Sequence, residues 1–274
     1  MSVKHSKIMP VAILFVVLMM TSCGGAAEEI APTATPTAAV AEAGSDTGDA
    51  AISDPAPGAG ECSNPYLPVV LNANWAYAAS GGEVGPYTFT TTVSEVFPDR
   101  FTLTLEFDDL TLTQHWECTS EGLVALELGG GTAASLVTGD VEANLETSNI
   151  EGVTIPAGIS AGDTWTHSMD VSGDVAIGDG MSGIAEGRAT STFQAVGMES
   201  VEVPAGTFEA LRVDSEFTLD LTVTTDAFSL PVAFTSTGST WYAPNSGWVL
   251  QTSSSTFFEM ATTEMIELQT YSIP

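Results

Sequence analysis

Basic residues are the scarcest class in this chain. Five lysines and arginines stand against 35 aspartates and glutamates, which gives a formal net charge of −30 at pH 7. Beyond residue 22 no lysine occurs, and the basic residues are Arg100, Arg188 and Arg212. Such a chain repels the phosphates of nucleic acids and anionic lipid headgroups, because its field has one sign. We therefore expect no nucleic-acid partner and interpret most of the acidic residues as a solvated surface.

Histidine is also scarce, and the usual catalytic patterns are missing. Beyond residue 22 only His115 and His167 occur, each isolated among strand-like residues. Gly158–Gly162 matches Gly-x-Ser-x-Gly, but a strand-like segment follows it and not the helix of a nucleophile elbow. Gly129–Gly131 lacks the Lys-Ser or Lys-Thr of a phosphate-binding loop. Asp108 and Asp109 are adjacent, but neighbours in a strand point to opposite faces. We therefore expect no enzyme activity, no catalytic residue and no cofactor.

Residues 1–22 have the pattern of a targeting segment. Lys4 and Lys7 are followed by Ile8–Met20, an apolar run of about thirteen residues that is too short to span a bilayer comfortably. The next residues, Met20-Thr21-Ser22-Cys23, resemble the bacterial lipobox, in which a small residue precedes a lipidated cysteine. The resemblance implies a lipoprotein signal peptide over residues 1–22 and an extracytoplasmic protein anchored to the bacterial cell membrane by lipid on Cys23. The alternative is an ordinary signal peptide with a chance cysteine.

Two further cysteines, Cys62 and Cys118, complete the total of three. An even pair in an exported chain favours a disulfide, because conditions outside the cytoplasm are oxidising. The bond would close a loop of about 57 residues and contribute roughly 4 kcal/mol in the chain-entropy model. Two cysteines without histidines at ligand spacing do not make a zinc site, so we expect no metal there.

Residues 23–60 have the composition of a disordered tether. They are rich in Ala, Pro, Thr, Asp and Glu, with no aromatic and almost no large aliphatic residue, so they cannot bury a core. Their charges are all acidic, and like-charge repulsion extends such a segment. Residues 61–274 are enough for one large domain or two small ones, and we expect a single β domain there.

The longest regular pattern runs from Leu211 to Leu221. Its odd positions are apolar except Ser215 and its even positions are charged or hydroxylic, as in a strand with one buried face. The turn sequence Val203–Phe208 comes just before it, where Pro204 presets φ and Gly206 can adopt positive φ. We therefore expect a long antiparallel hairpin.

The rest of residues 61–274 is β-rich too. Tyr87–Val96 reads as a strand, and Phe101–Asp108 alternates strongly before its phase shifts at Asp108–Asp109, which predicts a bulge or turn. Helix signals are scarce, and the best candidate is Ala133–Leu145. The predicted fold is all-β and mainly antiparallel: one large curved sheet or half-barrel with few helices.

An acidic segment, Asp170–Gly183, is rich in glycine and predicts a loop or irregular hairpin. Asp170, Asp174 and Asp179 could supply oxygens to a hard cation such as Ca²⁺. Their spacing fits no known calcium loop, so we favour a solvated acidic loop.

A weak internal repeat suggests two related halves. Asn72–Tyr77 and Ala161–Thr166 each lead from turn residues into a tryptophan that opens a strand. Gln114–Val124 and Ser239–Val249 each contain a tryptophan followed six residues later by a glycine that opens the next strand. Core packing explains most of these tryptophans, and a ligand-facing lining is the alternative.

Several short motifs resemble those of uncharacterised bacterial lipoproteins and secreted proteins. They are Cys62–Tyr66, Gly162–Trp165, Val203–Phe208 and Trp241–Val249. The hairpin and closing motifs also look like those of β domains related in shape to the LolA/LolB lipoprotein-carrier fold. That resemblance implies an open barrel whose apolar concave face can hold an acyl chain.

Two functions follow as hypotheses. The first is a membrane-anchored lipoprotein that binds a lipid or another hydrophobic ligand in its curved sheet. The second is a structural or interaction module, displayed at the cell surface, that binds another envelope protein.

Overall fold

We analysed a computed structural model, which describes residues 62–82, 85–108, 110–128, 141–177, 181–257 and 260–274. The targeting segment, Cys23 and the tether lie outside the described residues. Every regular element of the described part is a β-strand, so the all-β prediction is confirmed. The strands are β1 (Asn74–Gly81), β2 (Tyr87–Val96), β3 (Arg100–Glu106), β4 (Thr111–Thr119), β5 (Gly122–Ala125), β6 (Val141–Gly152), β7 (Ile155–Pro156), β8 (Thr164–Ile177), β9 (Met181–Val203), β10 (Gly206–Thr224), β11 (Ser229–Ala243), β12 (Gly247–Phe257) and β13 (Met260–Ser272).

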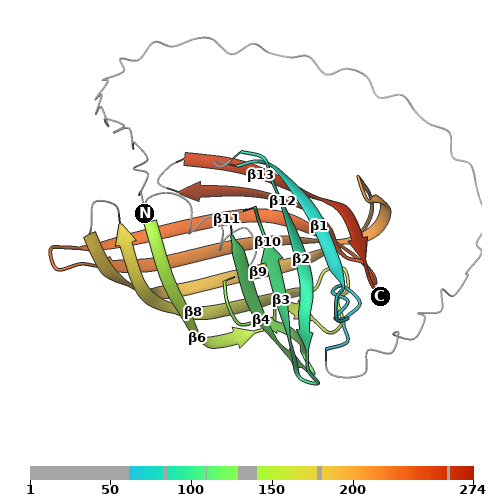
Figure 1. Cartoon of the computed structure of the whole chain (residues 1–274), viewed down its shortest axis with the longest axis horizontal. Coiled ribbons are helices and arrows are strands. Elements are labelled where there is room, and N and C mark those ends of the chain that lie inside the picture. Colours follow the sequence, from blue (N-terminus) through green and yellow to red (C-terminus); the bar gives the residue numbers. More distant parts are fainter. Residues whose placement is uncertain (1–61, 83–84, 109, 129–140, 178–180, 258–259) are drawn as a thin grey trace, which may run out of the picture. The chain divides into compact units, whose positions relative to one another are not determined.

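All thirteen strands belong to one antiparallel sheet. Its order is β6-β8-β9-β10-β11-β12-β13-β1-β2-β3-β4-β5-β7, so β6 and β7 are its two edges and the sheet is open. These edges are nearly consecutive in the chain, because only Val153 and Thr154 separate β6 from β7. Figure 1 shows the strong curvature that brings β2–β4 round toward β6 and β8. The prediction of one large curved sheet is therefore confirmed.

The weak sequence repeat has a counterpart in the strand order. The strands β1–β5 follow one another as neighbours in the sheet, and so do β8–β12. Each set has a tryptophan in its first strand and another in its fourth, and a glycine opens its fifth strand. The corresponding residues are Trp75 and Trp165, Trp116 and Trp241, and Gly122 and Gly247.

The central hairpin is longer than the sequence pattern predicts. β9 has 23 residues and β10 has 19, and they pair from Val203 opposite Gly206 to Ile184 opposite Thr224. The predicted turn at Pro204 is present, and Gly206 has φ of 138°. For Asp170–Gly183 the predicted loop was wrong and the predicted hairpin is confirmed, although its described arms are regular: β8 continues to Ile177, which pairs with Met181 of β9. Pairing on both sides holds these Gly and Asp residues in a strand despite their low β propensity.

The helix candidate Ala133–Leu145 was also wrong where it can be judged. Its last five residues, 141–145, belong to β6 and pair with β8. Residues 129–140 lie outside the described part of the chain. The predicted change of phase after Phe101–Asp108 is confirmed as a turn, in which the Phe107 amide donates to the Leu110 carbonyl. No described helix is long and apolar enough to cross a membrane.

The predicted disulfide joins Cys62 to Cys118 in β4. Both cysteines are buried in the largest apolar cluster of the sheet. Next to this bond, the Asn64 side-chain amide donates to the Pro156 carbonyl at 2.9 Å, and its Oδ1 accepts from the Tyr66 amide at 2.9 Å. The disulfide and Asn64 together fix the residues that lead into β1.

Candidate functional site

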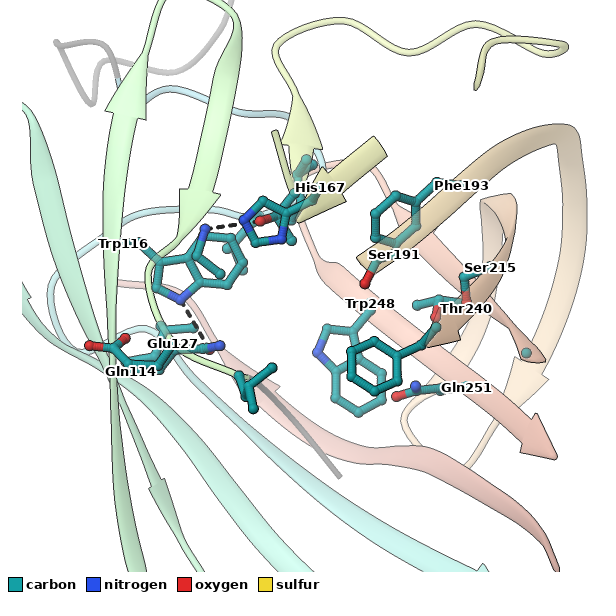
Figure 2. A pocket seen from close by; sticks show the side chains of 18 of the residues that line it. Gln114, Trp116, Glu127, His167, Ser191, Phe193, Ser215, Thr240, Trp248 and Gln251 are labelled. Atoms are coloured by element: carbon teal, nitrogen blue, oxygen red, sulfur yellow. Dashed lines mark hydrogen bonds between the residues drawn. The ribbon is translucent and has the colours of Figure 1, made fainter. Parts of the chain in front are cut away.

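The inner face of the curved sheet encloses a cavity of about 290 Å³. Side chains from β2–β5 line one side of it, and side chains from β8–β12 line the other. In Figure 2, Gln114 and Trp116 lie on one side, and Phe193, Ser215 and Thr240 lie on the other. The cavity is therefore built by the curvature of the whole sheet, and no single motif contains it.

Small side chains leave the space open. Ser215 in β10 is directly opposite Gly238 in β11, which is directly opposite Ser253 in β12. All three residues line the cavity. Directly paired residues of an antiparallel sheet share one face, so this row of small side chains forms a shallow track across three strands. Phe217 and Tyr242 line the cavity from the same strands, so the space lies between large side chains and small ones.

Aromatic rings form much of the apolar lining. Trp248 lines the cavity and stacks on Tyr77, with ring centroids 3.8 Å apart. Phe89 lines the cavity beside them and stacks on Tyr77 at 5.1 Å. Tyr77 is almost wholly buried, and its hydroxyl donates to the Trp248 carbonyl at 3.1 Å. Such packed rings hold one wall of the cavity rigid.

Several polar groups in the lining have partners inside the protein. The Trp116 indole Nε1 donates to Gln114 Oε1 at 3.1 Å. Glu127 accepts from the His115 backbone amide through Oε2 at 2.7 Å, and its Oε1 lies 2.7 Å from His115 Nδ1. Thr154 Oγ1 accepts from the Ala125 amide at 2.9 Å. These side chains therefore make structural hydrogen bonds within the protein.

His167 has a buried ring nitrogen without such a partner. Its side chain lies in the lining, the residue is 6% exposed, and Nε2 is buried without a hydrogen-bond partner among the described residues. Burial lowers the pKa of the ring, because the charged form loses its hydration, and a hydrogen bond with the Ala125 backbone partly offsets this effect. At neutral pH the ring is therefore an uncharged group that faces an apolar space.

The sequence contained a signal for His167 that was not used. Trp165, His167, Met169 and Val171 alternate in β8 and share one face, and the last two are buried. A histidine in the middle of such a set belongs to the apolar face. Its unpartnered nitrogen could not be read from the pattern, because that property depends on residues far away in the chain.

The opposite face of the sheet carries ion pairs. Arg188 Nη1 lies 2.7 Å from Asp170 Oδ1, and Asn149 donates to the same carboxylate at 2.8 Å. Arg212 Nε lies 2.8 Å from Asp214 Oδ1, and its Nη1 lies 3.6 Å from Glu199 Oε1. The hydrogen bonds from Asn149 and Arg188 lower the pKa of Asp170. These contacts join neighbouring strands on the solvent side.

The acidic cluster considered for a cation is not assembled by the described residues. Asp170 and Asp174 lie in β8, and Asp170 is held by Arg188 and Asn149. Asp179 lies outside the described part of the chain. In the ranges that the structure describes, no group of three or more His, Cys, Asp or Glu side chains could hold a metal ion. The prediction of a solvated loop was wrong for Asp170 and Asp174, which are strand residues.

Comparisons with known proteins give distant structural neighbours. No protein-family model matches the chain, and no curated protein matches its sequence. A candidate exported protein with a YmcC-like fold from Bacteroides fragilis NCTC 9343 is similar at 14% identity, with a TM-score of 0.44 over 77% of this chain and 100% of that one. A candidate lipoprotein from Parabacteroides distasonis ATCC 8503 has 13% identity and a TM-score of 0.42 over 76% and 99% of the two chains. The hypothetical lipoprotein YmcC from Escherichia coli (K12) has 10% identity and a TM-score of 0.30 over 74% and 85%.

At these levels of sequence identity and TM-score, no activity, ligand or partner of these neighbours is assigned to this chain. The resemblance to the LolA/LolB fold is not shown by the comparisons and stays a prediction. Lipid on Cys23 likewise stays a prediction, since that residue lies outside the described part.

Proposed function

We propose that this protein is an extracytoplasmic lipoprotein, anchored to the bacterial membrane through Cys23, that binds an apolar or amphipathic small molecule on the inner face of its sheet. The observation that carries the proposal is the cavity of about 290 Å³, lined by aromatic, aliphatic and small hydroxyl side chains. Ligand sites are concave and mostly apolar, and begin at roughly this size. The role is binding without catalysis.

The test uses the full chain carrying Cys23→Ala, exported from a bacterium so that the disulfide forms. Native mass spectrometry of this protein is expected to detect a discrete added mass that disappears after organic extraction. A mass without ligand, together with no binding of added long-chain alcohols, would contradict the proposal. That outcome would favour the second hypothesis, an interaction module displayed at the cell surface.

A matched pair of variants locates the ligand. Ser191 lines the cavity, and its neighbour Thr192 is exposed on the opposite face of β9. Ser191→Leu is expected to fill part of the cavity and reduce ligand binding by about tenfold, which corresponds to roughly 1.4 kcal/mol. Thr192→Leu adds the same side chain outside the cavity and should leave binding unchanged. Equal binding by both variants would mean that the ligand lies elsewhere.

A further inference from the structure

The cavity contains free hydrogen-bonding groups on side chains that are almost wholly buried. Thr91 in β2 and Gln114 in β4 line it, and the two residues are 7% and 8% exposed. Gln114 Oε1 accepts from the Trp116 indole, but Gln114 Nε2 and Thr91 Oγ1 have no partner among the described residues. Neither atom is fully covered, because His167 Nε2 is the one buried side-chain polar atom of the described chain that lacks a partner. Their accessible surface therefore faces the cavity, where a bound molecule can supply the partner.

The opposite wall carries more groups of the same kind. Ser215 and Ser253 lie directly across from Gly238 in the two neighbouring strands. Two residues along β11, Thr240 lies directly opposite Gln251 of β12. All five residues line the cavity, and the four side chains have no hydrogen-bond partner among the described residues. Figure 2 shows Ser215, Thr240 and Gln251 together on this side, so they surround the gap that Gly238 leaves in the lining.

These groups are uncharged, and each can both donate and accept hydrogen bonds. A serine or threonine hydroxyl offers one proton and two lone pairs, and a glutamine amide offers two protons and a carbonyl oxygen. A ligand that uses such groups on both walls needs several donors and acceptors of its own. A head group with many hydroxyls, such as a sugar ring or a glycerol, has this property. A hydrocarbon or a single hydroxyl would leave most of the groups unpaired.

The charges around the cavity disfavour an ionic head group. Its described lining contains no lysine or arginine, so a buried phosphate or carboxylate would have no cation beside it. Glu127 is the one acidic residue of that lining, and both of its carboxylate oxygens already contact His115, one the backbone amide and the other the ring. A cationic head group would therefore find no free carboxylate there. An uncharged head group is buried at lower cost than either ion.

Apolar side chains continue from this polar region on the same face of the sheet. Phe217 follows Ser215 by two residues in β10, and Phe193 of β9 lies directly opposite Ser215. Met169 and Leu128 also line the cavity, and they belong to one apolar cluster with Phe217. A hydrocarbon chain attached to the head group can therefore lie on an apolar surface.

We propose that the ligand is an uncharged amphiphile with a polyhydroxyl head group, which lies between Thr91 and Gln114 on one wall and the polar side chains around Gly238 on the other, with its hydrocarbon part toward Phe217 and Met169. This inference rests on the proposed function, and it adds the chemical class of the ligand and the residues that select it. Hydrogen bonds to uncharged side chains select the head group, and the lack of a cation in the described lining rejects anionic amphiphiles.

The experiment compares octyl β-D-glucoside with sodium octanoate, using the full chain with Cys23→Ala and an intact disulfide. Calorimetry below the critical micelle concentration of each compound measures the two dissociation constants. The glucoside is expected to bind at least about tenfold more tightly, because octanoate has no head-group hydroxyls and is buried without a cation. In NMR spectra, the amide signal of Gly238 should shift when the glucoside binds.

Two double variants with the same substitutions test the head-group contacts. Thr91→Val with Ser253→Ala removes two hydroxyls from the cavity and should weaken glucoside binding by about tenfold, while octanoate binding stays the same. Thr88→Val with Ser254→Ala makes these changes at exposed positions of the same two strands and should leave both affinities unchanged. None of the four hydroxyls has a partner among the described residues, so both double variants should fold, and urea denaturation checks this.

The failures are distinguishable. Octanoate binding as tightly as the glucoside, or equal glucoside binding by the two double variants, would overturn the assigned head group and leave ligand binding intact. Binding of neither compound, together with no ligand by native mass spectrometry, would overturn the proposed function itself.

Discussion

At His167, burial has a consequence for stability. The pKa of the ring in the folded protein lies below its ordinary value of 6.5 because of burial. The unfolded chain therefore binds a proton below pH 6.5 that the folded protein does not bind. The histidine leaves stability unaffected above pH 6.5 and reduces it as the pH falls from 6.5 toward the pKa of the folded state.

We expect the unfolding free energy to fall more between pH 8 and pH 5.5 in the wild type than in His167→Gln, because glutamine does not titrate. Urea denaturation at several pH values measures the unfolding free energy of both proteins. The carboxylates that the two proteins share contribute equally, so their contributions cancel when one free energy is subtracted from the other. The expectation fails if the difference in unfolding free energy between the wild type and His167→Gln does not change with pH. The folded protein would then take up the proton as readily as the unfolded chain.

The few arginines of the folded part show how a strongly acidic surface is held together. Arg212 lies between Glu199 of β9 and Asp214 of β10, and its guanidinium is 5.7 Å from the Trp241 ring of β11. The Trp241 Nε1 donates to Glu199 at 2.8 Å. One cation thus relieves repulsion between two carboxylates and links three adjacent strands. Such half-exposed pairs contribute modestly to stability, and more as a network than singly.

At the scale of single elements, the turn between β9 and β10 depends on one backbone conformation. Gly206 has φ of 138°, and the nearest atom to a Cβ placed there is Phe208 Cε2 at 3.9 Å. A Cβ therefore fits at this position without a clash, and only the positive φ disfavours a residue other than glycine. Gly206→Ala should lower the unfolding free energy by about 1 kcal/mol.

Gly158→Ala is the control for this prediction. Gly158 lies outside the positive-φ region, and a Cβ there would meet nothing within 4 Å. Its effect on the unfolding free energy should stay within about 0.5 kcal/mol. Thermal and urea denaturation of both variants test the comparison, and equal losses would mean that the turn is not the cause.

The strands differ in how far their sequences reveal them. Leu211–Leu221 was identified as a strand because period-2 alternation and strong β-formers agree there. Asp170–Gly183 was misread because its glycines and aspartates have poor β propensity, although Val171 and Val175 are buried on one face. Pairing with β6 and β9 overrides that local preference.

The cavity lay beyond sequence reasoning for a related reason. The alternation predicted which residues face inward, including the small side chain of Ser215. The opposing wall comes from β2–β5, more than 80 residues away in the chain, so its position depends on the curvature of the whole sheet. An apolar concave face could therefore be expected, but its volume and the buried, unpartnered nitrogen of His167 could not.

At the scale of the whole folded unit, the disulfide ties the residues before β1 to β4. The bonded cysteines are 56 positions apart, with a Cα–Cα distance of 4.8 Å. Replacing both residues in the variant Cys62→Ala with Cys118→Ala should lower the unfolding free energy by about 4 kcal/mol, mainly because the unfolded chain regains freedom. Alanine avoids placing an unpaired hydroxyl in the core.

Urea denaturation with and without a reducing agent checks this expectation. The reducing agent should destabilise the wild type by a similar amount and should have no effect on the double variant. A double variant as stable as the oxidised wild type would contradict the expected role of the bond.

The open sheet also has an edge that other copies could join. β6 pairs with β8 on one side, and in the described part of the chain no strand pairs with its other side. A free strand edge is a template for aggregation, and proteins blunt such edges with bulges and charges. In β6 the register shifts between Ser148 and Glu151, Asn149 adopts φ of 47°, and Glu146 and Glu151 are exposed. The irregular, acidic edge strand β6 thus discourages edge-to-edge assembly, which would protect a protein that is, as we propose, concentrated on a membrane surface.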